Sequence, residues 1–185
     1  MRAWMRVAVV WAVMALSVSV VAETQSPAAA QAEGRLRILV LHGPNLNLLG
    51  RREPHIYGTT TLEQIDQRLG VLARELNVEL TTVQSNTEGV LVDTFQKHMD
   101  SADGALINGA GLTFSSVSLH DVIKAMPFPV IEVHISNLGT RDEIHRNSIL
   151  TPAVRGTVMG LGWRSYTAAL RALVEIVREE KAAKR

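Results

Sequence analysis

The 185-residue sequence contains no cysteine, and only 4% of its residues are aromatic. The lack of cysteine excludes disulfide bridges, thiolate zinc sites and cysteine nucleophiles. With 19 basic and 18 acidic side chains, the chain also lacks the positive surplus that usually marks a nucleic-acid-binding protein. Neither G-x-G-x-x-G nor the P-loop pattern occurs, which disfavours a nucleotide site. A hydrophobic fraction of 46% excludes a disordered polypeptide and indicates a folded domain.

Residues 1–22 have the features of an export signal. Arg2 and Arg6 precede an apolar run at 7–22, and no acidic residue occurs before Glu23. This run is shorter than the roughly 20 residues with which a helix crosses a bilayer, and it ends in small residues, as cleaved signals do. We therefore expect an exported, periplasmic protein with no stable membrane insertion after cleavage. An uncleaved membrane anchor is the alternative.

The rest of the chain divides into a linker and one domain. Residues 23–35 are small and polar, which suits a flexible linker. Residues 36–185 are enough for one domain with a substantial core and too few for two ordinary ones. Strand patterns occur at 35–42, 78–85, 105–108, 130–135 and 156–161, and helix patterns occur at 61–77, 88–100, 116–126 and 165–181.

This alternation of strands and helices favours parallel pairing through right-handed crossovers. We expect an α/β protein with a flavodoxin-like three-layer sandwich, in which a five-stranded parallel sheet has the order 2-1-3-4-5. Thr61 and Gln64 are expected to form a capping box at the start of the first helix. Sheets of this kind bind ligands beyond the carboxyl ends of their strands, where the strand order reverses. The site should therefore follow the first, third and fourth strands.

Polar side chains occur at those three strand ends. Asn45 follows the first strand and Asn108 ends the third. Glu132 and His134 are two residues apart on the fourth strand, so they share one face. A carboxylate beside an imidazole can prepare it as an acid or base near neutral pH, although a structural hydrogen bond is the plainer interpretation. Glu132, His134 and a third ligand could hold zinc, but no HExxH or comparable spacing supports such a site.

Tyr57 lies in a charged loop shortly after Arg51 and Arg52. A loop tyrosine usually packs on the surface, and paired arginines are often solvated or bind a substrate carboxylate. The alternative is that Tyr57 acts as a base, because a guanidinium within about 4–6 Å favours the phenolate anion. Spacing alone does not decide between these interpretations.

Several longer motifs resemble those of type II 3-dehydroquinate dehydratases. Residues 41–65 read LHGPNLNLLGRREPHIYGTTTLEQI, and the similarity continues through 84–89, the Asn108 loop, IEVHISN at 131–137, and Arg141. It also includes 156–162 and covers about residues 36–178. The resemblance implies a flavodoxin-like fold, in agreement with the strand pattern. It further implies that water is removed from 3-dehydroquinate through an enolate to give 3-dehydroshikimate, with no metal or cofactor.

Matched residue by residue, the resemblance implies a catalytic set. Tyr57, as tyrosinate, would take a proton from the carbon next to the ketone, and Arg52 rather than Arg51 would stabilise that anion. Asn45 would help to place a water that donates to the enolate oxygen. His134, oriented by Glu132, would protonate the departing hydroxyl. The implied substrate-binding residues are Asn108, Ile135, Ser136 and Arg141.

The resemblance also implies a moving loop and an assembly. Residues 49–59 would close over the substrate as a lid and exclude water. Asp121 matches a family residue that reaches the site of a neighbouring subunit. The expected assembly is a homo-oligomer in which trimers form a dodecamer.

Two implied substrate-binding positions depart from the family pattern. Phe114 stands where the family has histidine, and His145 stands where it commonly has arginine. His120 replaces a further arginine, while Arg146 or a protonated His145 could compensate. The implied catalytic residues Arg52, Tyr57, Glu132 and His134 are all present, whereas two of the implied substrate-binding residues are replaced. This combination predicts a working elimination site with a weakened or shifted substrate preference.

Three functions remain open on the sequence. The favoured one is an exported 3-dehydroquinate dehydratase that serves quinate breakdown outside the cytoplasm. The second is an exported dehydratase of a related cyclic hydroxy-ketone, which a more apolar pocket around Phe114 would suit. The third is a non-catalytic ligand-binding protein that retains the same scaffold.

Overall fold

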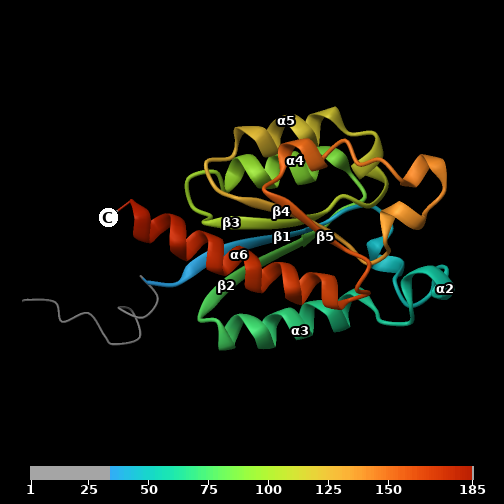
Figure 1. Ribbon diagram of the computed structural model, residues 1–185, viewed down its shortest axis with the longest axis horizontal. Coiled ribbons are helices and arrows are strands. Elements are labelled where there is room, and N and C mark those ends of the chain that lie inside the picture. The colour runs from blue at the N-terminus through green and yellow to red at the C-terminus, as the bar shows by residue number, and fades with distance from the viewer. Residues whose placement is uncertain (1–33, 185) are drawn as a thin grey trace, which may run out of the picture. The chain divides into compact units, whose positions relative to one another are not determined.

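The computed structural model describes residues 34–184, which form a parallel sheet between two layers of helices (Figure 1). The strands are β1 (Leu36–His42), β2 (Val78–Gln84), β3 (Gly104–Asn108), β4 (Val130–His134) and β5 (Gly156–Met159). They pair in parallel in the order β2-β1-β3-β4-β5. The predicted flavodoxin-like topology is therefore confirmed. The predicted export signal and residues 23–33 of the predicted linker lie outside the described residues.

Helices cover both faces of the sheet. Figure 1 shows α3 (Leu62–Glu75) and α6 (Arg164–Ala183) on one face, and α4 (Glu88–Lys97) and α5 (Val117–Ala125) on the other. A short helix, α2 (Pro54–Tyr57), lies beyond the carboxyl edge of the sheet. Short 3-10 helices occur at Leu46–Leu48, Ala110–Phe114, Leu138–Thr140, Glu143–His145 and Thr151–Ala153. Within residues 34–184 no helix is both long enough and apolar enough to cross a membrane.

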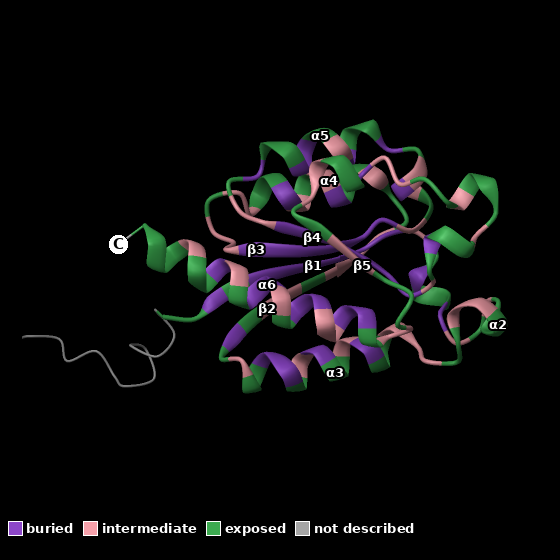
Figure 2. Cartoon of the chain, in the orientation of Figure 1, coloured by how far each residue is buried: buried purple, intermediate pink, exposed green. Residues whose placement is uncertain are grey.

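The sheet separates two hydrophobic cores. Ile38 and Val40 of β1 pack with the residues of α3 and α6, whereas Leu39 and Leu41 pack with those of α4 and α5. The central strands are buried on both faces, and the edge strands β2 and β5 are only partly covered (Figure 2). A sheet enclosed in this way needs near-continuous apolar strands, and this requirement explains why LRILVLH at 36–42 is apolar throughout its centre.

Side-chain caps begin two of the helices, α3 and α5. Thr61 accepts a hydrogen bond from the Gln64 backbone while the Gln64 side chain accepts one from the Thr61 backbone, so the predicted capping box is present. Ser116 caps α5 by accepting from the backbone of Leu119. The predicted strands and long helices are all observed, with ends that differ by no more than three residues. The sequence patterns did not predict α2 or the 3-10 helices, because a single turn has no periodicity.

A close backbone approach brings the loops after β1 and β3 together. The Gly43 amide donates a 2.8 Å hydrogen bond to the Asn108 carbonyl. A Cβ atom on Gly43 would lie only 2.4 Å from the Gly109 carbonyl oxygen. Because only glycine fits there, the loops that carry Asn45 and Asn108 lie side by side at the carboxyl edge of the sheet.

Candidate active site

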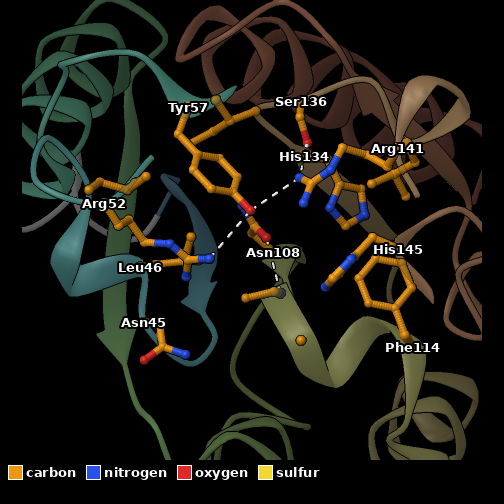
Figure 3. Close-up of a pocket in the computed structure, with 15 residues that line it drawn as sticks. Asn45, Leu46, Arg52, Tyr57, Asn108, Phe114, His134, Ser136, Arg141 and His145 are labelled. Atoms are coloured by element: carbon orange, nitrogen blue, oxygen red, sulfur yellow. Dashed lines mark hydrogen bonds between the residues drawn. The ribbon is translucent and has the colours of Figure 1, made fainter. Parts of the chain in front are cut away.

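A cavity of about 170 Å³ lies at this edge, where the strand order reverses between β1 and β3 (Figure 3). This is the place at which open parallel sheets bind ligands. Most of the predicted site residues line the cavity: Asn45, Arg52, Tyr57, Asn108, Phe114, His134, Ile135, Ser136, Arg141 and His145. Residues separated by up to a hundred positions in the sequence therefore share one small space, which we call the inner pocket.

The hydroxyl of Tyr57 lies between two guanidinium groups. Arg52 Nη2 is 3.4 Å from Tyr57 Oη, and Arg141 Nη1 is 3.1 Å from it. In Figure 3 the two arginines approach the hydroxyl from opposite sides. Both guanidinium groups also lie near the tyrosine ring, at 4.8 and 5.5 Å from its centroid. The hydroxyl is therefore held between two cationic hydrogen-bond donors at the pocket, an arrangement that suits a tyrosine acting as a base.

Local backbone geometry presents Tyr57 to the pocket. The chain enters α2 through Glu53 in the left-handed region and leaves it through Gly58, which also has a positive φ. Pro54 occupies the first turn, where its missing amide hydrogen costs nothing. The resulting single turn ends on Tyr57, whose side chain is half-buried. Arg52 is partly buried beside it, whereas Arg51 is exposed and lies outside the inner pocket.

His134 is paired with a fully buried carboxylate. Its Nε2 atom is 2.8 Å from Glu132 Oε1, as the shared strand face predicts. Glu132 also accepts hydrogen bonds from Ser148, Thr151 and Thr157. Burial raises the pKa of Glu132, but the hydrogen bonds outweigh that effect and leave its pKa below the ordinary value. Glu132 thus stays ionised and fixes a proton on Nε2 of His134, which leaves Nδ1 for proton exchange.

The polar groups that could bind substrate are also fixed. Asn108 is buried, with its Oδ1 accepting from the Ala110 backbone and its Nδ2 donating to Tyr166. Ser136 accepts a 3.2 Å hydrogen bond from Arg141. Asn45 has a positive φ of 65°, and its backbone amide donates to the Asn86 side chain. The pocket therefore offers directed donors and acceptors together with acid–base groups.

The two departures from the family pattern contact each other. The rings of Phe114 and His145 meet edge to face, with centroids 5.3 Å apart and planes at 90°. Asp142 accepts from His145 Nδ1 at 2.7 Å, and this hydrogen bond lowers the pKa of Asp142. The replacements at 114 and 145 thus form one packed unit on one wall of the inner pocket (Figure 3).

Three residues considered in the sequence, His120, Asp121 and Arg146, lie outside the inner pocket. Asp121, on α5, is 71% exposed, is hydrogen-bonded to His120, and does not line the inner pocket. Arg146 does not line it either, because its Nη2 donates to the Arg141 carbonyl. Within residues 34–184 no group of three or more His, Asp or Glu side chains is placed to hold a metal ion.

Tyr57 also lines a second cavity. We call it the outer pocket; its volume is about 620 Å³, and its lining includes His55, Asn137 and Trp163. Tyr57 and Arg141 line both pockets and so form part of the wall between them.

Sequence reasoning missed two features of the site. It assigned only Arg52 to Tyr57, whereas Arg141, 84 residues further along the chain, makes the shorter contact. It also overlooked His42 and Tyr166, which are buried behind Asn108. The scarcity of tyrosine, with only two in the chain, was the one signal that could have drawn attention to Tyr166.

The fold and the pocket define a flavodoxin-like protein with a small cavity lined by candidate acid–base side chains. Comparisons with known proteins narrow this class. The family model described as class II dehydroquinase matches residues 36–174. The chain belongs to this family.

Individual relatives support the same family assignment. The chain is 54% identical over 136 residues to the 3-dehydroquinate dehydratase of Bordetella pertussis, an alignment that covers 73% of this chain and 94% of the relative. It is 46% identical over 137 residues to that of Pelotomaculum thermopropionicum, which covers 74% and 95%. The crystal structure of type II dehydroquinase from Butyrivibrio crossotus matches with a TM-score of 0.74 and 35% identity, and the match covers 75% of this chain and 97% of that one.

Proposed function

We propose that this protein is a hydro-lyase that converts 3-dehydroquinate to 3-dehydroshikimate and water. Family membership supports the reaction class, and the relatives named above are dehydratases of this substrate. The observation that carries the proposal is the pairing, in one pocket, of an arginine-flanked phenol with a carboxylate-backed imidazole. A base and an acid facing one cavity are what an elimination of water requires.

The reaction begins with Tyr57. Its phenolate removes a proton from the carbon next to the ketone, and the electron pair of that C–H bond forms the enolate. Arg52 and Arg141 stabilise the phenolate before transfer, and a water held by Asn45 donates to the enolate oxygen.

The reaction ends at His134. As the enolate collapses to the conjugated ketone, the C–O bond breaks, and the imidazolium gives its proton to the hydroxyl, which leaves as water. Glu132 orients the ring and stabilises its positive charge. Every proton is carried by a side chain or water, so the proposed sequence of steps uses neither a metal nor a cofactor.

Polar groups that line the inner pocket recognise the substrate. Asn108, Ser136 and the backbone at Ile135 bind the hydroxyls and carboxylate of the substrate. Residues 49–59 act as a lid, since they carry both Arg52 and Tyr57. Asp121 completes the site of a neighbouring subunit in a homo-oligomer of trimers that form a dodecamer.

The activity is tested by incubating the purified protein with 3-dehydroquinate and following the absorbance of the conjugated enone. Tyr57→Phe is expected to lower kcat by roughly 10²–10⁴-fold, the usual contribution of a general base. Arg52→Gln should lower kcat about 10²-fold because it removes one preorganised positive charge. Arg51→Gln is the matched control, because Arg51 is the exposed neighbour, and it should retain activity. Absence of product at high enzyme concentration would reject the proposal.

A related cyclic hydroxy-ketone is the second candidate substrate, and the packed pair of Phe114 and His145 favours it. An edge-to-face aromatic contact makes that wall more apolar than one built from imidazole and guanidinium. If this candidate holds, the double variant Phe114→His, His145→Arg should raise kcat/KM for 3-dehydroquinate about tenfold or more, since one restored hydrogen bond is worth about 1–3 kcal/mol where its partner is buried. An unchanged or lower value would count against it.

The same assays address a non-catalytic role. Binding of quinate-like acids that persists in Tyr57→Phe, with no turnover by the wild-type protein, would identify a ligand-binding protein instead.

We also propose export to the periplasm, supported by the composition of residues 1–22. A cleaved chain recovered from the periplasmic fraction is the expected result, and an uncleaved chain in the membrane fraction would contradict it. Export would place the enzyme in quinate breakdown.

A further inference from the structure

A chain of buried hydrogen bonds ends at the pocket residue Asn108. His42, at the end of β1, is fully buried, and its Nδ1 lies 3.1 Å from Tyr166 Oη. Tyr166, on α6, is also fully buried and accepts from Asn108 Nδ2 at 3.0 Å. At the other end, His42 Nε2 is 3.0 Å from Oδ1 of Asp66 on α3. These hydrogen bonds therefore link α3, β1, α6 and β3 behind the inner pocket.

The direction of each hydrogen bond follows from the chemistry of the groups. The Asp66 carboxylate can only accept, so Nε2 of His42 carries the proton. In a neutral imidazole Nδ1 is then an acceptor, and the Tyr166 hydroxyl must donate to it. Burial raises the pKa of Tyr166, which keeps that hydroxyl protonated. The Tyr166 oxygen is thus left as an acceptor for the Asn108 amide.

The amide of Asn108 has no freedom to rotate in this arrangement. Its Oδ1 accepts from the Ala110 amide at 3.1 Å, and one Nδ2 hydrogen is used by Tyr166. The second Nδ2 hydrogen remains, and Asn108 lines the inner pocket (Figure 3).

Buried polar groups cost free energy unless all their hydrogen bonds are made, and apolar side chains could fill the same space. In this series of hydrogen bonds one terminal residue, Asn108, lines the inner pocket, and the other, Asp66, is one-third exposed. The series therefore connects a partly exposed carboxylate to a pocket residue.

We propose that Asp66, His42 and Tyr166 are positioning residues that hold the Asn108 amide in one orientation, so that an N–H is offered to a hydroxyl or carboxylate oxygen of the substrate. The role of Asn108 rests on the proposed function. The orientation of its amide rests only on the described contacts.

The variant Asp66→Asn tests this series of hydrogen bonds from Asp66 to Asn108, which we call the relay. The new amide can donate to His42 Nε2, which allows the Nδ1–H tautomer. That tautomer would donate to Tyr166, and the Tyr166 hydroxyl would then turn toward Asn108 and oppose its amide hydrogens. We expect KM for 3-dehydroquinate to rise about tenfold, the effect of one lost hydrogen bond, with a smaller change in kcat.

Glu63→Gln is the matched control. It makes the same change of charge on the same helix, at a carboxylate that accepts from Gln67 and belongs to neither pocket. KM should be unchanged in this variant. An Asp66→Asn protein with a lower melting temperature but wild-type KM would show a merely structural contact and overturn the proposal.

A spectroscopic measurement is independent of activity. In ¹⁵N-histidine-labelled protein, with the His42 signals assigned through His42→Gln, the wild-type ring should show the Nε2–H tautomer and Asp66→Asn should show more Nδ1–H. A wild-type His42 that is an imidazolium or an Nδ1–H tautomer would overturn the relay. Because this result needs no turnover, failure of the proposed dehydratase activity remains distinguishable from failure of the relay.

Discussion

At the scale of single residues, Glu132 shows how a buried carboxylate stays ionised. The carboxylate is fully buried in β4, yet it accepts hydrogen bonds from His134 and from three hydroxyl side chains. Hydrogen bonds to the charged form offset the cost of burial, so the group stays ionised. Position 132 therefore couples the stability of the fold to the proton state of the site.

This coupling predicts a pH dependence of stability. Because folding lowers the pKa of Glu132 below its ordinary value of 4.5, its stabilising contribution is present above pH 4.5 and is lost as the pH falls through the folded pKa. The melting temperature of the wild type should therefore fall more steeply below pH 4.5 than that of Glu132→Gln. Calorimetry over this range checks the difference, and Glu175→Gln, an exposed change on α6, should follow the wild type. Parallel curves for wild type and Glu132→Gln would contradict the assignment.

At the scale of elements, the site depends on how closely two strand ends approach. The Gly43 amide bonds to the Asn108 carbonyl, and a side chain at Gly43 would collide with the backbone of Gly109. The loops after β1 and β3 can therefore meet only because position 43 carries no Cβ.

Gly43→Ala should destabilise the protein by about 1–3 kcal/mol, since backbone atoms must move to admit the methyl group. The same displacement should lower activity, because Asn45 and Asn108 flank the contact. Urea unfolding measures the change in stability, and steady-state kinetics measure the change in activity.

Gly89→Ala is the control. Gly89 lies in α4, and a Cβ atom added there would meet nothing within 4 Å, so alanine should stabilise the protein by about 0.4–1 kcal/mol. Equal effects of the two changes would refute the argument.

At the scale of the whole molecule, the described chain shows a face that the proposed assembly would cover. Asp121 and Val117 are one turn apart on α5, and both are strongly exposed, at 71% for the Asp121 side chain and 63% for Val117. If Asp121 acts in a neighbouring site, Asp121→Ala and Tyr57→Phe should each be nearly inactive alone. Mixed subunits should regain part of the activity, because some sites then combine an intact Tyr57 with an intact Asp121.

Unfolding and refolding of each variant by itself is the control for this mixing experiment. No recovery in the mixture, with both variants assembled, would place Asp121 outside the neighbouring site.

The sequence could predict the sheet and the four long helices because their signals are local. Alternating apolar strands and amphipathic helices indicate a parallel sheet with right-handed crossovers, and five strands with four helices suit the flavodoxin-like order. The location of the site followed from the same topology, and the spacing of Glu132 and His134 predicted their contact. Pairings across loops were not predictable in this way. The contact of Arg141 with Tyr57 depends on how two irregular segments close, and no period or motif records that closure.

The wall between the two pockets has a consequence for inhibitor design. Tyr57 and Arg141 line both the inner and the outer pocket. If Tyr57 is the base that we propose, a compound lodged beside Trp163 would contact this tyrosine without imitating any feature of a cyclic hydroxy acid. Under the proposed mechanism, an inhibitor of this enzyme would therefore not need to compete with the substrate for the inner pocket.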